Sequence, residues 1–235
     1  MAKKIAIMQP YFFPYIGYFQ LINSVDEFVI YDNIQYTKKG WINRNRILVN
    51  GSDSLISLTL KKDSDFLDVV QRQLSDSWTK DRLKLLNQIK GNYQKAPYFK
   101  EVYPLIEKCI LNEKVNLFDF IYDSLILILD FLEIKTKITI SSTINIDHTL
   151  KSKDKVIAIC KEQCAEIYIN AIGGMELYDK SEFLINNIQL NFIKSSPIIY
   201  KQYDNQFVSW LSIIDVMMFN DKIIISRFLN DYTLI

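Results

Sequence analysis

The sequence contains few histidines and cysteines, which restricts the metal sites, disulfides and catalytic bases that it can form. His148 is the single histidine among 235 residues, which excludes metal sites built on a histidine pair and leaves at most one imidazole base. Cys109, Cys160 and Cys164 are odd in number and lack CxxC spacing. This pattern argues against a disulfide framework and a zinc site, and it suits a reducing compartment. We therefore expect no metal site and a cytoplasmic location.

A charge excess and a long hydrophobic run are also missing. With 28 basic and 27 acidic residues the formal net charge is +1, so no overall field attracts nucleic acid or an anionic membrane. The most apolar stretch, 120–132, contains Asp123 and Asp130 and is shorter than the roughly 20 residues of a membrane span. The apolar start of the chain is interrupted by prolines and tyrosines, which indicates a first strand rather than a leader. We predict no nucleic-acid partner and no membrane insertion.

The residues that are present have the composition of a globular protein, 49% apolar and 23% charged. The runs 4–8 and 27–31 have the pattern of buried strands and flank a helical segment at 17–24. Two strands joined by a helix form a βαβ unit, which predicts a parallel sheet. Ligands bind such sheets beyond the carboxyl ends of the strands, where we expect Gln9 and Asp32 to lie.

The remaining pattern predicts one α/β domain over residues 1–235, with a mostly parallel central sheet, flanking helices, a hairpin insertion and a helical block. Asn50-Gly51 is a strong hairpin turn between strands at 47–49 and 55–60. The helical subregion covers about 76–134, with helices over 78–93, 98–112 and 117–133. Further strands are expected over 138–142, 166–170 and 189–194, and helices over 153–163, 183–187 and 209–219, the last capped by Ser209 or Ser212.

The loop after the first strand is the first candidate site. Its two prolines stiffen the turn, and Gly17 allows a close approach of the backbone to a ligand. Tyrosines with polar tips are suited to a pocket wall, although any one of them can serve only in aromatic core packing. From this loop we predict substrate contacts by Gln9, Tyr11, Gly17 and Tyr18.

The segment 32–46 is the leading candidate site, because amides, cations and aromatic rings are crowded into one loop after a strand. Arginine pairs with phosphate through its planar fork, and tryptophan stacks on flat or sugar faces. The composition therefore favours a phosphate-bearing small molecule, although each charge taken singly fits a solvated hairpin flank. The residues predicted to act here are Asp32, Tyr36, Trp41, Asn43, Arg44 and Arg46.

Three other features have weaker signals. Gly173, Gly174 and Tyr178 follow a strand, and backbone N–H groups there can face an anion, but the motif matches neither GxGxxG nor a P-loop and also fits a plain turn. His148 lies beside an aspartate in a surface turn, and without a GxSxG motif nucleophilic hydrolysis is disfavoured. Asp215 fits the first turn of a helix, where it complements the helix dipole, or it orients a site residue.

Four segments resemble the WbqC-like protein family: QPYFFPYIGYFQLI, DNIQYTKKGWINRNRI, YINAIGG with its following tyrosine, and LSIIDVMMFN. The resemblance runs along essentially the whole chain, and the first two segments are the specific ones. Such families are associated with bacterial O-antigen and other surface-polysaccharide (lipopolysaccharide) gene clusters, and members have been suggested to transfer glycine or other aminoacyl groups to sugars. The resemblance places these residues in the shared pattern: Gln9, Pro10, Tyr11, Pro14, Gly17, Asp32, Tyr36, Trp41, Asn43 and Arg44.

The resemblance leads to a hypothesis of an enzyme that joins an amino acid or another acyl group to the amino group of a nucleotide-linked sugar. Asp32 would take a proton from the attacking amine, while Arg44 and Arg46 would hold phosphate and stabilise negative charge. Tyr11 and Trp41 would contact the sugar or the base.

ATP enters the hypothesis as a cofactor through an acyl-adenylate, since the opening turn is similar to the start of nucleotidylyl-transferase folds. The HxGH histidines of those folds are absent, however, and tyrosines stand in the comparable turn. Two alternatives remain open: a glycosyl or other nucleotide-sugar-modifying enzyme with the same phosphate contacts, or a non-catalytic partner in polysaccharide assembly. A large exposed apolar patch in place of a deep pocket would indicate the partner.

Overall fold

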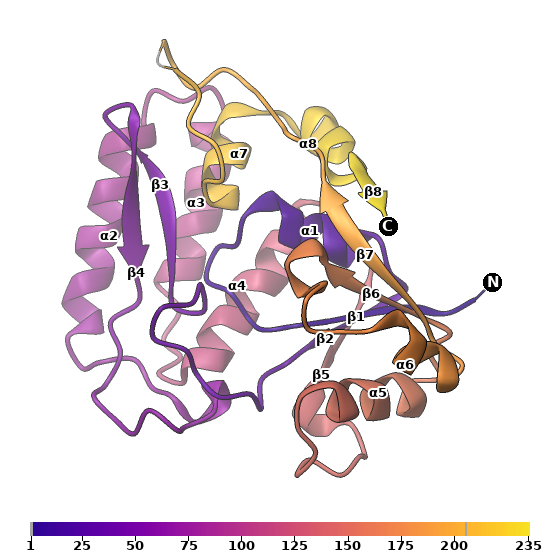
Figure 1. Cartoon of the computed structure of the whole chain (residues 1–235). Helices are drawn as coiled ribbons and strands as arrows, with labels where there is room; N and C mark the ends of the chain where they lie inside the picture. The colour runs from indigo at the N-terminus through magenta and orange to yellow at the C-terminus, as the bar shows by residue number, and fades with distance from the viewer. Residues whose placement is uncertain (1, 205) are drawn as a thin grey trace.

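The computed structural model describes residues 2–204 and 206–235, and in them an α/β fold is built on a six-stranded sheet (Figure 1). The strand order is β5-β2-β1-β6-β7-β8, and the neighbouring strands are parallel except for the antiparallel pair β7–β8. The mostly parallel sheet predicted from the sequence is thus confirmed. The strands are β1 (Lys4–Met8), β2 (Glu27–Ile30), β5 (Lys137–Ile140), β6 (Ile167–Ala171), β7 (Gln189–Ser195) and β8 (Tyr232–Leu234).

The inner strands are apolar on both faces because helices cover both sides of the sheet. Ala6 and Phe28 belong to a large core cluster that also contains residues of α1 and of the helical block. Ile5, Ile7 and Val29, which alternate with them, belong to a second cluster with residues of α5 and α6. This burial on two sides explains why the first strands are continuous hydrophobic runs.

The helices flank the sheet in two groups (Figure 1). Residues of α1, of the block α2–α4 and of α7 and α8 contribute to the larger cluster, whereas α5 and α6 contribute to the smaller one. The helices are α1 (Ile16–Asn23), α2 (Trp78–Tyr93), α3 (Phe99–Ile110), α4 (Leu117–Phe131), α5 (Ser152–Glu162), α6 (Lys180–Ile185), α7 (Ile213–Phe219) and α8 (Lys222–Leu229).

Successive strands are added to one side of β1 first and to its other side afterwards. The chain leaves β1 through α1 and returns on one side of it as β2, with β5 beyond, whereas α5 leads back to β6 on the other side. The carboxyl ends of β1 and β6 therefore form a topological switch point, where crossover loops diverge and leave a crevice. We expect a ligand to bind at this point of the sheet.

The hairpin insertion consists of β3 (Arg44–Val49) and β4 (Ser52–Ser57). Asn50 and Gly51 have φ values of 50° and 78°, as a tight two-residue hairpin turn requires. The second strand begins three residues before the predicted 55–60, because this turn lets pairing start directly at Ser52 opposite Val49. The predicted hairpin and its turn are confirmed.

The helical block agrees with the predicted segments to within two residues at each end, and Ser212 caps α7 through a bond from Ile214 N (3.2 Å). Neither α8 nor β8 was expected from the sequence. A strand of three residues is too short for a periodic pattern, and β8 exists because it pairs with the end of β7. No helix in the described part of the chain has the length and apolarity needed to cross a membrane.

We expect Glu27→Gln to reduce the dependence of stability on pH. Glu27 is 1% exposed, and burial raises its pKa, but hydrogen bonds from Lys3, Thr139 and Lys137 outweigh burial and lower the pKa below 4.5. A lowered pKa contributes stability above the unfolded value, and this contribution is lost as the pH falls through the folded value. In urea unfolding, the variant should be about 1–3 kcal/mol less stable at pH 7 and lose less on acidification to pH 3. Parallel pH profiles of the two proteins would contradict this assignment.

Candidate functional site

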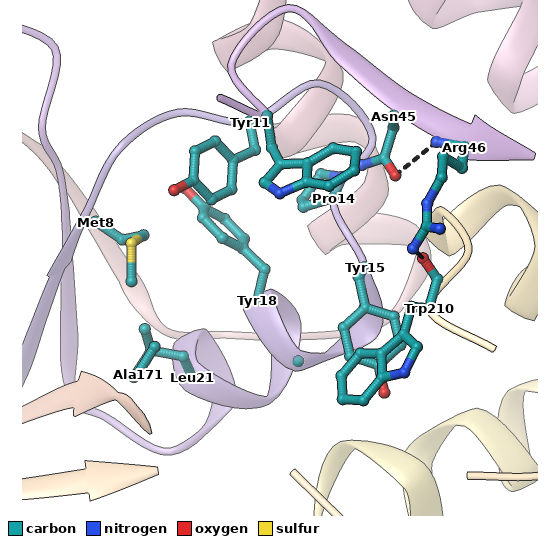
Figure 2. Close-up of a pocket in the computed structure, with 12 residues that line it drawn as sticks. Met8, Tyr11, Pro14, Tyr15, Tyr18, Leu21, Asn45, Arg46, Ala171 and Trp210 are labelled. Carbon is teal, nitrogen blue, oxygen red and sulfur yellow. Dashed lines mark hydrogen bonds between the residues drawn. The ribbon is translucent and has the colours of Figure 1, made fainter. Parts of the chain in front are cut away.

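A cavity of about 340 Å³ lies at the switch point (Figure 2). Met8 at the end of β1 and Ala171 at the end of β6 both line it, so it occupies the crevice that the strand order predicts. The loop before α1, the start of the hairpin and the segment before α7 supply the other walls. The lining residues are Met8, Tyr11, Pro14, Tyr15, Gly17, Tyr18, Leu21, Trp41, Asn45, Arg46, Ala171 and Trp210. We call this cavity the switch-point pocket.

Five of the twelve lining residues are aromatic. Tyr11 and Tyr18 face one another with ring centroids 5.5 Å apart, and Tyr15 packs against Trp210 at 5.0 Å (Figure 2). Trp41 and Trp210 are 42% and 59% exposed, which is high for tryptophan in a folded protein. Exposed aromatic faces beside a cavity suit the stacking of a sugar ring or a planar base.

The proline-rich loop is held by main-chain and side-chain bonds from distant segments. Phe12 N donates to Ile42 O (3.0 Å), and Asn45 Nδ2 donates to both Phe12 O (3.1 Å) and Phe13 O (2.9 Å). Ser212 Oγ also donates to Phe13 O (2.8 Å). Phe13 has a φ of 42°, a conformation that non-glycine residues rarely adopt and that these bonds maintain. The pocket wall is therefore pre-organised.

Tyrosine hydroxyls and Gln9 supply polar groups at the inner end of the loop. Tyr18 donates to Gln9 O (2.9 Å), and Tyr11 makes a longer bond to Gln9 Oε1 (3.4 Å). Burial raises the pKa of Tyr11, and burial together with the nearby Tyr11 raises the pKa of Tyr18 well above its usual value. Both hydroxyls therefore stay protonated at neutral pH and act in hydrogen bonding rather than as bases.

Arg46 is the cation that lines the pocket. Its Nη1 contacts Asp53 Oδ2 at 3.2 Å and its Nη2 donates to Trp210 O at 3.3 Å, while its Nε has no acceptor in the described part of the chain. The guanidinium carbon lies 5.6 Å from the Trp41 ring centroid. Arg46 thus joins the walls formed by Trp41 and Trp210, and its side chain remains 29% exposed, so its guanidinium group can meet an anionic group.

Gly17 lines the pocket, but its close neighbours belong to the protein. A Cβ atom there would lie 2.8 Å from Ser195 Oγ and 3.1 Å from the Tyr15 ring. The glycine therefore lets α1 approach the end of β7 and leaves room for Tyr15. The predicted close approach of its own backbone to a ligand remains a prediction.

Asp32 lies at the carboxyl edge, as expected, but it is completely buried and does not line the switch-point pocket. Its Oδ1 accepts bonds from Ser141 Oγ (2.8 Å) and Ser142 N (2.9 Å). Its Oδ2 has no partner among the residues that the structure describes. One oxygen therefore joins the ends of β2 and β5, and the other is buried without a partner in the described part of the chain.

Arg44, Asn43 and Tyr36 support the site from outside the pocket. Arg44 Nε donates to Gly40 O (3.0 Å) and its guanidinium also bonds to the main-chain oxygen of Lys39, which holds the loop that carries Trp41. Asn43 accepts a bond from Tyr36 OH (2.8 Å) and donates to the hairpin. These contacts use polar groups that we predicted would face a ligand.

The two glycines and the tyrosine of the motif Gly173, Gly174 and Tyr178 lie in different surroundings. Gly174 packs against Asn170, since a Cβ atom would lie 2.2 Å from Asn170 Nδ2, and a Cβ at Gly173 would meet open space. Both glycines belong to a short 3-10 turn, Ile172–Gly174. Tyr178 lies in a different cavity, described below.

His148 is held by hydrogen bonds at both ring nitrogens. Asn33 Nδ2 lies 2.9 Å from Nδ1, and Nε2 lies 3.0 Å from Ile144 O. This arrangement fits a neutral ring with its proton on Nε2. The histidine therefore fixes the loop after β2, in keeping with the structural role that the sequence favoured.

Several pocket residues were not predicted, namely Met8, Leu21, Asn45, Ala171 and Trp210. Asn45 lies between two predicted residues, and its burial follows from strand alternation against Arg44 and Arg46. Trp210 has no comparable signal, because it is 164 residues from Arg46, to which its main chain is bonded. Only the folded chain brings them together.

Chemically, the pocket is equipped for binding more than for proton transfer. The residues that line it, all within the described structure, include no carboxylate and no imidazole. They offer stacking surfaces, protonated hydroxyls and one guanidinium group. A base for any reaction here must come from a substrate or from a neighbouring strand end.

Comparisons with known proteins show which family the chain is similar to. The model of the WbqC-like protein family matches residues 9–225, which include every pocket residue except Met8. The chain is 29% identical over 221 residues to the uncharacterized protein Rv1507c of Mycobacterium tuberculosis, and the alignment covers 92% of this chain and 93% of that protein. No solved structure matches the chain. From the span of the match, the chain belongs to the WbqC-like protein family.

Proposed function

We propose that the protein is a transferase that joins an amino acid, such as glycine, or another acyl group to the amino group of a nucleotide-linked sugar. The nucleotide-linked sugar binds in the switch-point pocket. The observation that carries the proposal is the position of an aromatic cavity at the carboxyl ends of β1 and β6 with Arg46 at its wall. The resemblance noted above supplies the reaction class and its role in O-antigen synthesis.

The pocket geometry supports a sugar-bearing ligand with a negatively charged group. Trp41 and Trp210 present exposed faces on which a pyranose ring or a base stacks. Among residues 2–204 and 206–235, Arg46 makes one ion pair, with the half-exposed Asp53. A phosphate is a stronger partner than a screened surface carboxylate and would displace it.

Amide formation needs an acceptor for the proton that leaves the amine. The nitrogen attacks the acyl carbon, the C–N bond forms, the bond to the leaving group breaks, and the nitrogen loses a proton. Asp32 Oδ2 is the proposed acceptor, because it is buried and unpaired in the described structure. Asp32 lies two residues after Ile30, and Ile30 is the register partner of the pocket residue Met8. In this scheme Arg46 holds the phosphate, and Arg44 acts by positioning the loop of Trp41.

Binding tests the proposal. A UDP-linked amino sugar titrated calorimetrically should bind the wild type, and Arg46→Gln should weaken binding about ten- to a hundredfold because a charge-assisted bond is lost. Trp41→Ala should weaken binding about five- to tenfold by removing a stacking face.

Arg227→Gln is the matched control, since Arg227 is exposed on α8 and does not line the pocket. It should bind like the wild type. No binding of nucleotide-linked amino sugars by the wild type, or equal binding by wild type and Arg46→Gln, would refute the proposal.

A further inference from the structure

A second cavity, of about 860 Å³, opens on the other face of the sheet's carboxyl edge. Its lining comes from the segment after β2, from the first turn of α5 and from the segment after β6. Tyr31 and Tyr178 pack against the core cluster of α5 and α6, whereas Tyr11 and Tyr15 of the switch-point pocket pack against the other cluster. The two cavities have no lining residue in common. The second cavity is therefore a separate site.

A buried lysine lines this second cavity. Lys155 is 4% exposed, its Nζ donates to Asn33 O (3.1 Å), and it lies 5.1 Å from the Tyr31 ring centroid. An ammonium group has three donors. Within residues 2–204 and 206–235, no carboxylate lies within ion-pair distance of it. Burial lowers the pKa of Lys155, and the more distant carboxylates of Asp68 and Asp32 oppose that shift only in part. Because a buried ammonium group is costly unless its donors are satisfied, an anion in the cavity would supply acceptors that Asn33 O alone does not.

The groups around Lys155 favour the binding of an anion. The cavity is lined by the first turn of α5, whose leading main-chain N–H groups have no partner within the helix. Lys151, at the start of this turn, is exposed and adds a second positive charge. Lys153 is held by Glu182 and contributes less. Burial lowers the pKa of Lys155, and a bound anion would oppose that shift.

Asp68 and Asp154 also line the cavity and restrict the kind of anion. Two carboxylates disfavour a polyphosphate chain, and they accept hydrogen bonds from sugar hydroxyls. Apolar walls from Tyr31, Phe66 and Leu177 leave room for the rest of a ligand, and the volume is in the usual range for small-molecule sites.

We propose that this second cavity binds a phosphate monoester of a sugar, with the phosphate at Lys155, Lys151 and the first turn of α5. The sugar hydroxyls face Asp68 and Asp154. The inference does not depend on the transferase proposal, because it follows from Lys155 and its surroundings.

Calorimetric titration with AMP, ribose 5-phosphate and adenosine tests the inference. The wild type should bind a phosphate ester and not adenosine. Lys155→Met should weaken binding about ten- to a hundredfold, as expected for loss of a charge-assisted bond. Without ligand it should stay folded, because an apolar chain replaces an unpaired buried charge. Lys161→Met, on an exposed position of the same helix, should bind like the wild type.

Lys151→Gln provides a second variant that leaves the core untouched, and it should weaken binding about two- to fivefold. Binding of AMP alone would identify a nucleotide, and binding of both esters would identify the sugar phosphate as the recognised unit. If neither ester binds the wild type, or if both lysine variants bind as tightly as the wild type, the inference is wrong.

Discussion

Replacing Asp215 with alanine is expected to destabilise the fold by about 3–5 kcal/mol. Asp215 is completely buried, and its Oδ1 accepts bonds from Tyr200 OH and Gln202 Nε2 (both 2.6 Å). Its Oδ2 accepts a bond from Tyr93 OH (2.8 Å), which in turn accepts from Leu48 N (2.8 Å). Alanine would leave these donors buried without an acceptor. Urea unfolding followed by circular dichroism measures the loss.

Two comparisons isolate the cause of the Asp215 effect. Asp215→Asn keeps the shape and one acceptor oxygen, so it should cost less, about 1–3 kcal/mol. Asp76→Ala removes an exposed carboxylate and should change stability by less than about 0.5 kcal/mol. A loss below about 1 kcal/mol for Asp215→Ala would show that the network contributes little. The network also anchors the segment before α7, which carries the pocket residue Trp210.

Asp32→Asn is expected to reduce the turnover of the proposed amide-forming reaction about 100- to 10,000-fold, the usual contribution of a positioned base. The asparagine oxygen can keep the bonds from Ser141 and Ser142, and its amide occupies the place of an oxygen that already lacks a partner. Stability should therefore change by about 1 kcal/mol or less. The measurement compares the rate of amide formation with the free energy of unfolding of the same preparation.

Asp26→Asn is the matched control for Asp32, because Asp26 is exposed just before β2, at the opposite edge of the sheet. It should retain normal turnover. Full activity of Asp32→Asn would assign Asp32 a purely structural role in joining β2 to β5. Loss of folding in Asp32→Asn would contradict the expectation that asparagine keeps the bonds from Ser141 and Ser142.

The sequence alone was sufficient for those parts of the fold that depend on neighbouring residues. The first βαβ unit, the Asn50-Gly51 turn and the three helices of the middle block were all predicted, and Ser212 was one of two predicted caps. Each follows from hydrophobic period, turn chemistry or capping within a few residues. The site region was also indicated, since Tyr11, Gly17, Tyr18, Trp41 and Arg46 line the pocket.

The roles of individual residues were not determined in this way. Arg44 and Arg46 are two positions apart in one strand, but Arg44 bonds to its own loop whereas Arg46 reaches the pocket. Tyr11 and Tyr178 belong to two candidate motifs that each follow a strand, and they lie in different cavities. Sequence spacing does not distinguish these cases, because the outcome depends on which side chain finds a carbonyl or a ring nearby.

Local patterning thus determined the elements, and the tertiary structure decided which of them meet. The order of the crossovers places the end of β6 beside the end of β1 and creates the switch-point pocket. Packing brings Trp210 to Arg46, 164 residues away, and Tyr93 to Asp215, 122 residues away. The physical reason is that secondary structure arises from interactions between near neighbours, whereas contacts over such separations form only when burial of the shared core fixes the path of the chain.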